Sequence, residues 1–127
     1  MSNFRNLDVW GKSIELVSKV YAITSSVDDV ALRNQIRRAV ISIPANISEG
    51  CARSGNKEFK QFLIIARGSV AELETFLEIL KNLNLVNTED IKNLLNDTKE
   101  IGMMINGLIR SIKEKLKTNN QKLKTEN

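Results

Sequence analysis

Residues 59–80 read FKQFLIIARGSVAELETFLEIL, and this stretch decides the fold. When successive residues are placed about 100° apart around an axis, most of its apolar side chains fall on one side. The members of this stripe are Phe59, Phe62, Leu63, Ala66, Val70, Leu73, Leu77 and Leu80. The spacing predicts an amphipathic helix that begins after Asn56 and reaches about Asn82.

A second group of apolar residues lies on roughly the opposite arc of this helix, so that only a narrow charged strip interrupts its surface. A helix that is apolar nearly all round is normally buried all round, and a four-helix monomer leaves about half of each helix exposed. We therefore predict an oligomer interface formed by Ile41, Ile64, Ile65, Gly68, Ala71 and Ile79. The alternative is that these are tolerated surface residues, which are normal where they are scattered singly.

Two further stretches show helical periodicity. One runs from about Asp8 to Ser25, with Asp8 as its N-cap, and the other runs from an N-cap at Thr88 to about Lys117. The residues after Lys117 are polar and aperiodic, which is typical of a frayed or disordered tail. We expect one domain, a bundle over residues 1–117, followed by a polar disordered tail over residues 118–127.

One more helix starts after Asp28 or Asp29 and ends near Gly50, which can adopt the left-handed conformation of a C-cap. Pro44 lies inside its pattern, removes a backbone donor and clashes with the carbonyl of Val40, so we expect a kink there. Four amphipathic helices joined by short links predict an all-α fold, an up-and-down antiparallel four-helix bundle with its second helix kinked at Pro44.

The composition excludes most catalytic chemistry. The chain has no His, which removes His-based acid–base catalysis, Ser-His-Asp triads and ordinary zinc sites. The single cysteine, Cys51, has no base nearby in the sequence to activate it as a nucleophile, and there is no glycine-rich loop for a phosphate. The carboxylates do not share a core-facing stripe. We expect no catalytic residue, no metal site and no cofactor, and hence a protein that is not an enzyme.

The start of the chain lacks a charged segment followed by an apolar one, so no secretory signal is expected. No apolar run approaches the 18 residues or so that a membrane span requires. A lone cysteine cannot form an internal disulfide. These features favour a cytoplasmic protein without a membrane partner.

The net charge of +4 is unevenly distributed. Residues 33–67 hold seven basic and two acidic side chains, and residues 110–127 hold six and two. Residues 68–109 hold three basic and seven acidic side chains. Such alternating blocks can bind an anionic polymer, or they can pair segments of one chain or of neighbouring subunits.

The basic residues are the remaining candidates for a binding site, and phosphate contacts need such donors in number. We predict that a nucleic acid is contacted by Arg33, Arg37, Arg38, Arg53, Lys57 and Lys60, with Arg110, Lys113 and Lys117 as auxiliary contacts. The last three also complement the negative end of a helix macrodipole, which is a sufficient structural reason for them. Aromatic residues for base stacking are few, so binding would read backbone and shape.

Four segments resemble motifs of one protein family. They are FRNLDVW at residues 4–10, QIRRAVISIPANISEG at 35–50, KEFKQFLIIARGSVAELE at 57–74 and INGLIRSI at 105–112. In combination they are similar to the bacterial four-helix-bundle family of 23S ribosomal RNA intervening-sequence proteins, over about residues 4–117. Ser48 stands where the family more often has Ala, and the first helix link lacks its usual Pro, but neither departure disturbs the fold.

The resemblance implies a ring-shaped homopentamer. It also implies kinship with the accessory variability subunits of diversity-generating retroelements, which are basic pentamers that bind nucleic acid and a reverse transcriptase. The expected partners are therefore other copies of this chain, RNA, and a reverse-transcriptase-like or other protein. We expect a non-enzymatic scaffold that contacts RNA or an RNA–protein complex. The alternative is a protein–protein adaptor that binds no nucleic acid.

Overall fold

The computed structural model describes the backbone of residues 3–126 and the side chains of residues 3–121. A short 3-10 helix, η1 (Phe4–Asn6), precedes four α-helices. These are α1 (Asp8–Thr24), α2 (Val30–Ala52), α3 (Asn56–Asn82) and α4 (Thr88–Glu126). The part of the chain that is described contains no strand.

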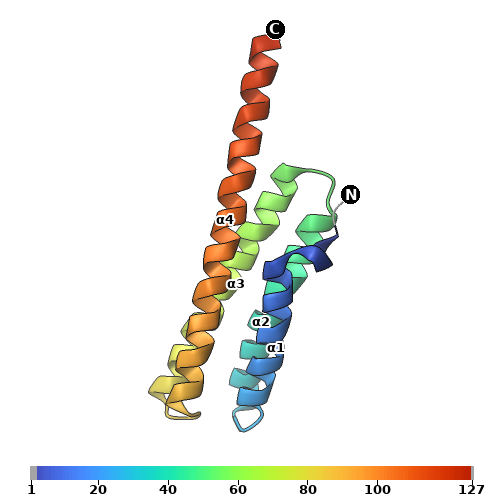
Figure 1. The fold of residues 1–127 in the computed structure, drawn as a ribbon. Coiled ribbons are helices and arrows are strands. Elements are labelled where there is room, and N and C mark those ends of the chain that lie inside the picture. Colours follow the sequence, from blue (N-terminus) through green and yellow to red (C-terminus); the bar gives the residue numbers. More distant parts are fainter. Residues whose placement is uncertain (1–2, 127) are drawn as a thin grey trace.

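The four helices run alternately up and down, with each one beside its neighbour in the sequence (Figure 1). Helix α4 also packs against α1, which closes the bundle, and η1 packs on α1 and α2. The predicted all-α, up-and-down antiparallel four-helix bundle is therefore confirmed. The α1–α2 and α3–α4 links lie at one end, and the α2–α3 turn lies at the other (Figure 1).

The apolar stripe of α3 forms the centre of the core. Leu63, Leu73, Leu77 and Leu80 are completely buried and pack with the apolar faces of the other three helices. Burying a leucine side chain stabilises the fold by roughly 1.5–3 kcal/mol, so this stripe is a large part of the driving force. The two phenylalanines at the start of the stripe, Phe59 and Phe62, are only half-buried, because they lie at the end of the bundle.

The helix starts differ in part from the prediction. The Asp29 carboxylate accepts the backbone N–H of Leu32 at 3.0 Å, so Asp29 caps α2 as expected. Asp8 and Thr88 were both predicted as N-caps but are the first residues of their helices. At α4 the cap is Asn87, whose side-chain oxygen accepts the N–H groups of the two following acidic residues. An amide at that position satisfies the same unpaired donors.

The α3–α4 corner is built on Asn84, which has a φ of 56°. Its N–H donates to the Lys81 carbonyl, and the next N–H, of Leu85, donates to the Leu80 carbonyl. This pair of bonds ends a helix on a left-handed residue, and asparagine tolerates that conformation better than most side chains. Helix α3 is therefore ended by an asparagine, at a position where glycine is more usual.

Gly50 does not end α2, contrary to the prediction. The helix continues to Ala52, and none of the described glycines has a positive φ. Gly50 is instead the point of closest approach between α2 and α3: a Cβ there would lie 2.6 Å from Phe62 Cβ and 3.1 Å from Phe59 Cδ1. Glycine is needed at this position because there is no room for a side chain, and not because of the backbone conformation.

Pro44 lies inside α2 and is buried, and α2 remains helical on both sides of it. The Asn46 side chain donates to the Ser42 carbonyl at 2.8 Å, so a polar side chain supports the backbone around the proline. The Ser42 hydroxyl in turn shares a hydrogen bond of 2.6 Å with Ser69 on α3. The predicted kink concerns the direction of the helix axis and stays a prediction.

The predicted disordered tail is not observed, because α4 continues as a helix to Glu126. Leu116 is the last residue packed against the core, and the described side chains from 117 to 121 are exposed. The segment contains neither glycine nor proline and is rich in lysine and other helix-compatible residues, so it can extend a helix that is already nucleated. Figure 1 shows α4 continuing past the α2–α3 turn.

The contact at Gly50 predicts a specific loss of stability. Gly50→Ala should lower the free energy of unfolding by about 1–2 kcal/mol, because the methyl group overlaps Phe62 by more than its better helix propensity recovers. Gly11→Ala is the matched control: Gly11 is also helical, but its Cβ would meet nothing within 4 Å. Chemical denaturation should show Gly11→Ala to be neutral or slightly stabilising. Equal stability of Gly50→Ala and the natural protein would contradict the close approach of α2 and α3.

Candidate nucleic-acid interface

Two of the arginines predicted to bind phosphate make hydrogen bonds within the fold instead, at the α1–α2 corner. Arg37 Nε donates to Thr24 Oγ1 at 3.0 Å, and its Nη2 donates to the Tyr21 carbonyl at 3.1 Å. The guanidinium also lies 4.2 Å from the centroid of the Tyr21 ring. Arg33 Nη1 donates to the Val27 carbonyl at 3.0 Å. Both cations therefore bind the end of α1 and the following link, where the α1 carbonyls form the negative end of the helix macrodipole.

Arg38, in contrast, is exposed and has no hydrogen bond or ion pair to any residue that the structure describes. It stands on α2 beside Arg37 in the sequence, away from the α2–α3 turn. The structure thus separates the first three predicted arginines from the remaining predicted cations.

The remaining predicted cations gather at the opposite end of the bundle. We define the basic end as Arg53, Lys57 and Lys60 around the α2–α3 turn, together with Arg110, Lys113, Lys115 and Lys117 on α4. Within residues 53–60 and 110–117 these seven cations face only two carboxylates, Glu58 and Glu114. All seven side chains are exposed except that of Lys60, which is half-buried.

Hydrogen bonds between α3 and α4 set the register that brings these cations together. Arg67 Nη1 donates to Asn106 Oδ1 at 3.1 Å, and Thr98 Oγ1 donates to the Glu74 carboxylate at 2.9 Å. Seven residues before Arg67 is Lys60, and seven residues after Asn106 is Lys113. Because the helices are antiparallel, these two lysines lie at about the same height. Residues 53–60 and 110–117 therefore form one end of the molecule.

Arg53 is partly neutralised. Its Nη2 lies 2.6 Å from Glu49 Oε1, and its guanidinium lies 5.2 Å from the centroid of the Phe62 ring. The side chain remains about half exposed, so the ion pair with Glu49 is a surface pair of small energy. Arg53 can exchange this carboxylate for a phosphate at little cost.

The acidic block of the sequence is partly paired within the fold. Lys12 Nζ lies 3.1 Å from Glu100 Oε1, and Lys19 Nζ lies 3.0 Å from Asp97 Oδ2, so two ion pairs join α1 to α4. The hydrogen bond to Glu100 raises the pKa of Lys12 above its ordinary value. Lysine pairing of this kind accounts for part of the alternating charge without any partner molecule.

Five further carboxylates stand on the α1–α2 link and around the α3–α4 corner: Asp28, Asp29, Glu78, Glu89 and Asp90. Both links lie at the end of the bundle opposite the basic end in Figure 1. Four cations stand at this end as well, namely Arg33, Arg37, Lys81 and Lys92. The charge there is therefore nearly balanced, and the excess of positive charge lies at the basic end.

Most of the predicted interface residues are exposed. Ile41 on α2 is 44% exposed and Ile65 on α3 is 51% exposed, although both are large apolar side chains. They flank the Ser42–Ser69 hydrogen bond between these helices, since Ile41 precedes Ser42 and the Ile65 carbonyl accepts from the Ser69 hydroxyl. Ile79, Gly68 and Ala71 are also exposed.

Ile64 differs from the other predicted interface residues. It is half-buried and packs against the core of its own bundle. This packing gives Ile64 a structural role within one subunit.

Gly68 has no structural explanation within one subunit. It lies in the middle of α3, its φ is not positive, and a Cβ there would meet nothing within 4 Å. Glycine in a helix interior costs about 0.5–1 kcal/mol relative to alanine. A flat, open position beside Ile65 is compatible with the close approach of another molecule.

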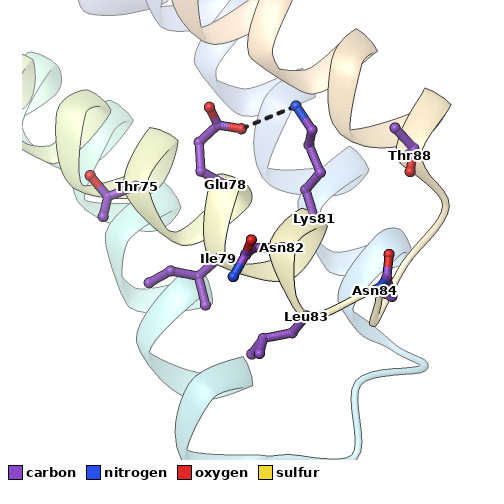
Figure 2. A pocket seen from close by; sticks show the side chains of 8 residues that line it. All are labelled: Thr75, Glu78, Ile79, Lys81, Asn82, Leu83, Asn84 and Thr88. Carbon is purple, nitrogen blue, oxygen red and sulfur yellow. Dashed lines mark ion pairs between the residues drawn. The ribbon is translucent and has the colours of Figure 1, made fainter.

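An open groove of about 800 Å³ lies at the α3–α4 corner, shown in Figure 2. The partly exposed Ile79 and Leu83 contribute apolar side chains, and the rim carries an ion pair of 3.7 Å between Glu78 and Lys81. The dashed line in Figure 2 joins these two charged groups to each other across the rim. Nothing in this groove assembles a nucleophile with a base.

The described part of the chain also holds no cluster of three or more potential metal ligands. Cys51 is buried, with a free thiol. No helix within the described range is long and apolar enough to cross a membrane.

These features define a class: a small helical bundle whose cations gather at one end and which exposes an apolar face. The chain belongs to the family of 23S rRNA-intervening sequence proteins, whose pattern it matches over residues 5–107. The resemblance noted in the sequence is thereby confirmed. No curated protein matches the chain significantly.

A solved structure supports the same assignment. It is described as a protein of unknown function from the S23 ribosomal protein family of Bacteroides thetaiotaomicron VPI-5482. The two chains share 26% sequence identity and superpose with a TM-score of 0.75, covering 80% of this chain and 95% of that chain. The similarity extends over nearly all of the neighbour and leaves a fifth of this chain outside.

The sequence did not point to Thr24, the buried residue whose hydroxyl oxygen accepts the hydrogen bond from Arg37. Its hydroxyl also donates to the Val20 carbonyl at 2.7 Å, so it links the end of α1 to α2. One signal for this contact was available: Arg33 and Arg37 are spaced one helical turn apart beside the apolar face of α2, where a cation can reach the end of a neighbouring helix.

The corner contacts predict that Arg37 contributes to stability. Arg37→Ala should lower the free energy of unfolding by about 1–2 kcal/mol, because it leaves the Tyr21 carbonyl and the buried Thr24 hydroxyl without their charged donor. Arg38→Ala removes the same charge from an exposed neighbour and should change stability by less than about 0.5 kcal/mol. Thermal or chemical denaturation distinguishes the two. If the variants are equally stable, the hydrogen bonds of Arg37 contribute nothing measurable.

Proposed function

We propose that this protein is a non-enzymatic homo-oligomeric scaffold that binds RNA through its basic end. The observation that carries the proposal is the grouping of seven cations on the α2–α3 turn, α3 and α4 against three carboxylates, Glu49, Glu58 and Glu114. Phosphate groups attract such a cluster in proportion to the number of contacts. The hydrogen bonds of Arg33 and Arg37 within the fold leave these two residues out of the proposed surface.

The comparisons support the choice of RNA among anionic polymers. The family is described by its connection with 23S rRNA intervening sequences, and the neighbour is assigned to an S23 ribosomal protein family. Both descriptions are of other proteins, and we extend them to this chain as part of the proposal. A reverse-transcriptase-like protein as an additional partner stays a prediction from the resemblance.

We place the oligomer contact on the exposed face around the Ser42–Ser69 hydrogen bond. The support is the exposure of Ile41 and Ile65 together with the unoccupied space at Gly68. A homopentamer, the state implied by the resemblance, would bring five basic ends together and multiply weak phosphate contacts.

A second candidate function is a protein–protein adaptor. The five carboxylates at the end opposite the basic end favour it, because complementary charges on two molecules attract each other without nucleic acid. For that function the mass of the assembly should fall as the salt concentration rises, since surface charge pairs are screened. An assembly held by the isoleucine face should resist the same change.

The RNA proposal is tested by two double variants of equal charge change. Lys60→Gln with Lys113→Gln removes two cations from the basic end, whereas Lys92→Gln with Lys99→Gln removes two exposed cations from elsewhere on α4. Fluorescence anisotropy across a salt series with a structured ribosomal-type RNA should show about tenfold weaker binding for the first variant and little change for the second. An equal loss for both variants, or the absence of binding by the natural protein, would refute the proposal.

The oligomer face is tested by Ile65→Glu, with Met103→Glu as the control. Met103 is 66% exposed on α4, so the same change there introduces the same charge at a site outside the proposed face. Sedimentation should show Ile65→Glu shifted toward the monomer and Met103→Glu with the mass of the natural protein. A natural protein that remains monomeric over the accessible concentration range would overturn the assignment.

A further inference from the structure

The basic end offers no fully exposed aromatic side chain on which an unpaired base could stack. Phe59 and Phe62 are half-buried, and so are Phe4 and Trp10, which the N-terminal segment brings to the same end of the bundle (Figure 1). Gly50 of α2 lies against the rings of Phe59 and Phe62, and the Arg53 guanidinium lies over Phe62. Proteins that bind single strands usually combine cations with exposed aromatic side chains, because each stacked base contributes roughly 1–3 kcal/mol.

The rings of Phe4 and Trp10 are engaged with each other and with a cation. Their centroids are 5.1 Å apart, and the Arg5 guanidinium lies 4.6 Å from the centroid of Phe4. Tyr21 is at the α1–α2 corner, under the Arg37 guanidinium. An RNA bound at the basic end would therefore be held through its phosphates and not through its bases.

The cations of the basic end form rows on two rigid, neighbouring helices. On α4, Arg110, Lys113 and Lys117 are spaced three and four residues apart and so lie along one side, over a length of about 10 Å. On α3, Lys57 and Lys60 are one turn apart, and packed helix axes lie about 8–10 Å from each other. The backbone positions of both rows are set by the bundle before any ligand arrives.

Such a preformed array suits a ligand whose phosphates are also held in place. A double helix presents phosphates in two strands at a constant separation, whereas a flexible single strand would lose conformational entropy to match fixed cations. The α4 row also lies where this helix leaves the bundle, since Leu116 is its last packed residue. The row stands beside the first turns of α3, and Figure 1 shows α4 continuing beyond it past the α2–α3 turn.

The α4 row lies beyond residue 107, where the match to the family ends. Arg110 still belongs to the INGLIRSI segment at residues 105–112, whereas Lys113 and Lys117 follow it. Resting on the proposed function, we propose that the RNA bound at the basic end is double-helical, and that the row of Arg110, Lys113 and Lys117 contacts its phosphates.

The test compares an RNA hairpin stem with an unstructured single-stranded RNA containing the same number of nucleotides. The natural protein at about 0.1 M salt should bind the stem at least about tenfold more tightly, since only the stem matches the fixed rows. Equal or tighter binding of the single strand would overturn the inference while leaving the proposed function intact. Binding of neither RNA would refute the proposed function itself, and the inference with it.

A pair of variants locates the contact. Lys113→Gln with Lys117→Gln should reduce the slope of log affinity against log salt for the stem by about 1.8, the value for two lost phosphate contacts on a double helix. The control, Lys92→Gln with Lys99→Gln, should leave that slope unchanged. If the first variant retains both the slope and the preference for the stem, then the α4 row does not make the contact.

Discussion

The close approach of α2 to α3 at Gly50 is the constraint on which the arrangement of the surface depends. Because no side chain separates the helices there, the rings of Phe59 and Phe62 cover the end of α2 directly. The turn that follows is consequently short, and it places Arg53 and Lys57 within a few residues of each other at one end of the bundle. The core stripe of α3 and its hydrogen bonds to α4 then bring the α4 cations to the same end.

Positive charge is concentrated at one end of the bundle for a topological reason. In an up-and-down bundle, alternate links lie at the same end, so the α1–α2 link and the α3–α4 corner both lie at the end opposite the α2–α3 turn. Both links carry carboxylates that cap or begin helices, which is a favourable use of negative charge near helix N-termini. The opposite end receives the basic turn and the cationic part of α4. Stability of the individual helices and polarity of the whole molecule thus arise from the same residues.

Much of the fold could be predicted because helical periodicity is a local property. The stripe on α3, the cap at Asp29 and the antiparallel order all follow from residue spacing and short links. Gly50 was misinterpreted, because crowding by Phe62 depends on a neighbouring helix. The structural role of Arg37 could not be predicted for a related reason. Its hydrogen bond to Thr24 exists only once α1 and α2 have packed together. The helical extension after Lys117 was missed because it lacks an apolar stripe, although nothing in its composition ends a helix.

The packing limit at Leu116 has a consequence for how this protein can diverge. Before that point each helix carries buried residues, and a substitution of one of these acts on stability first. Beyond it, α4 needs only residues that tolerate a helix, and its length and charge can change without disturbing the core. The surface of this extension can therefore be changed while the bundle stays the same.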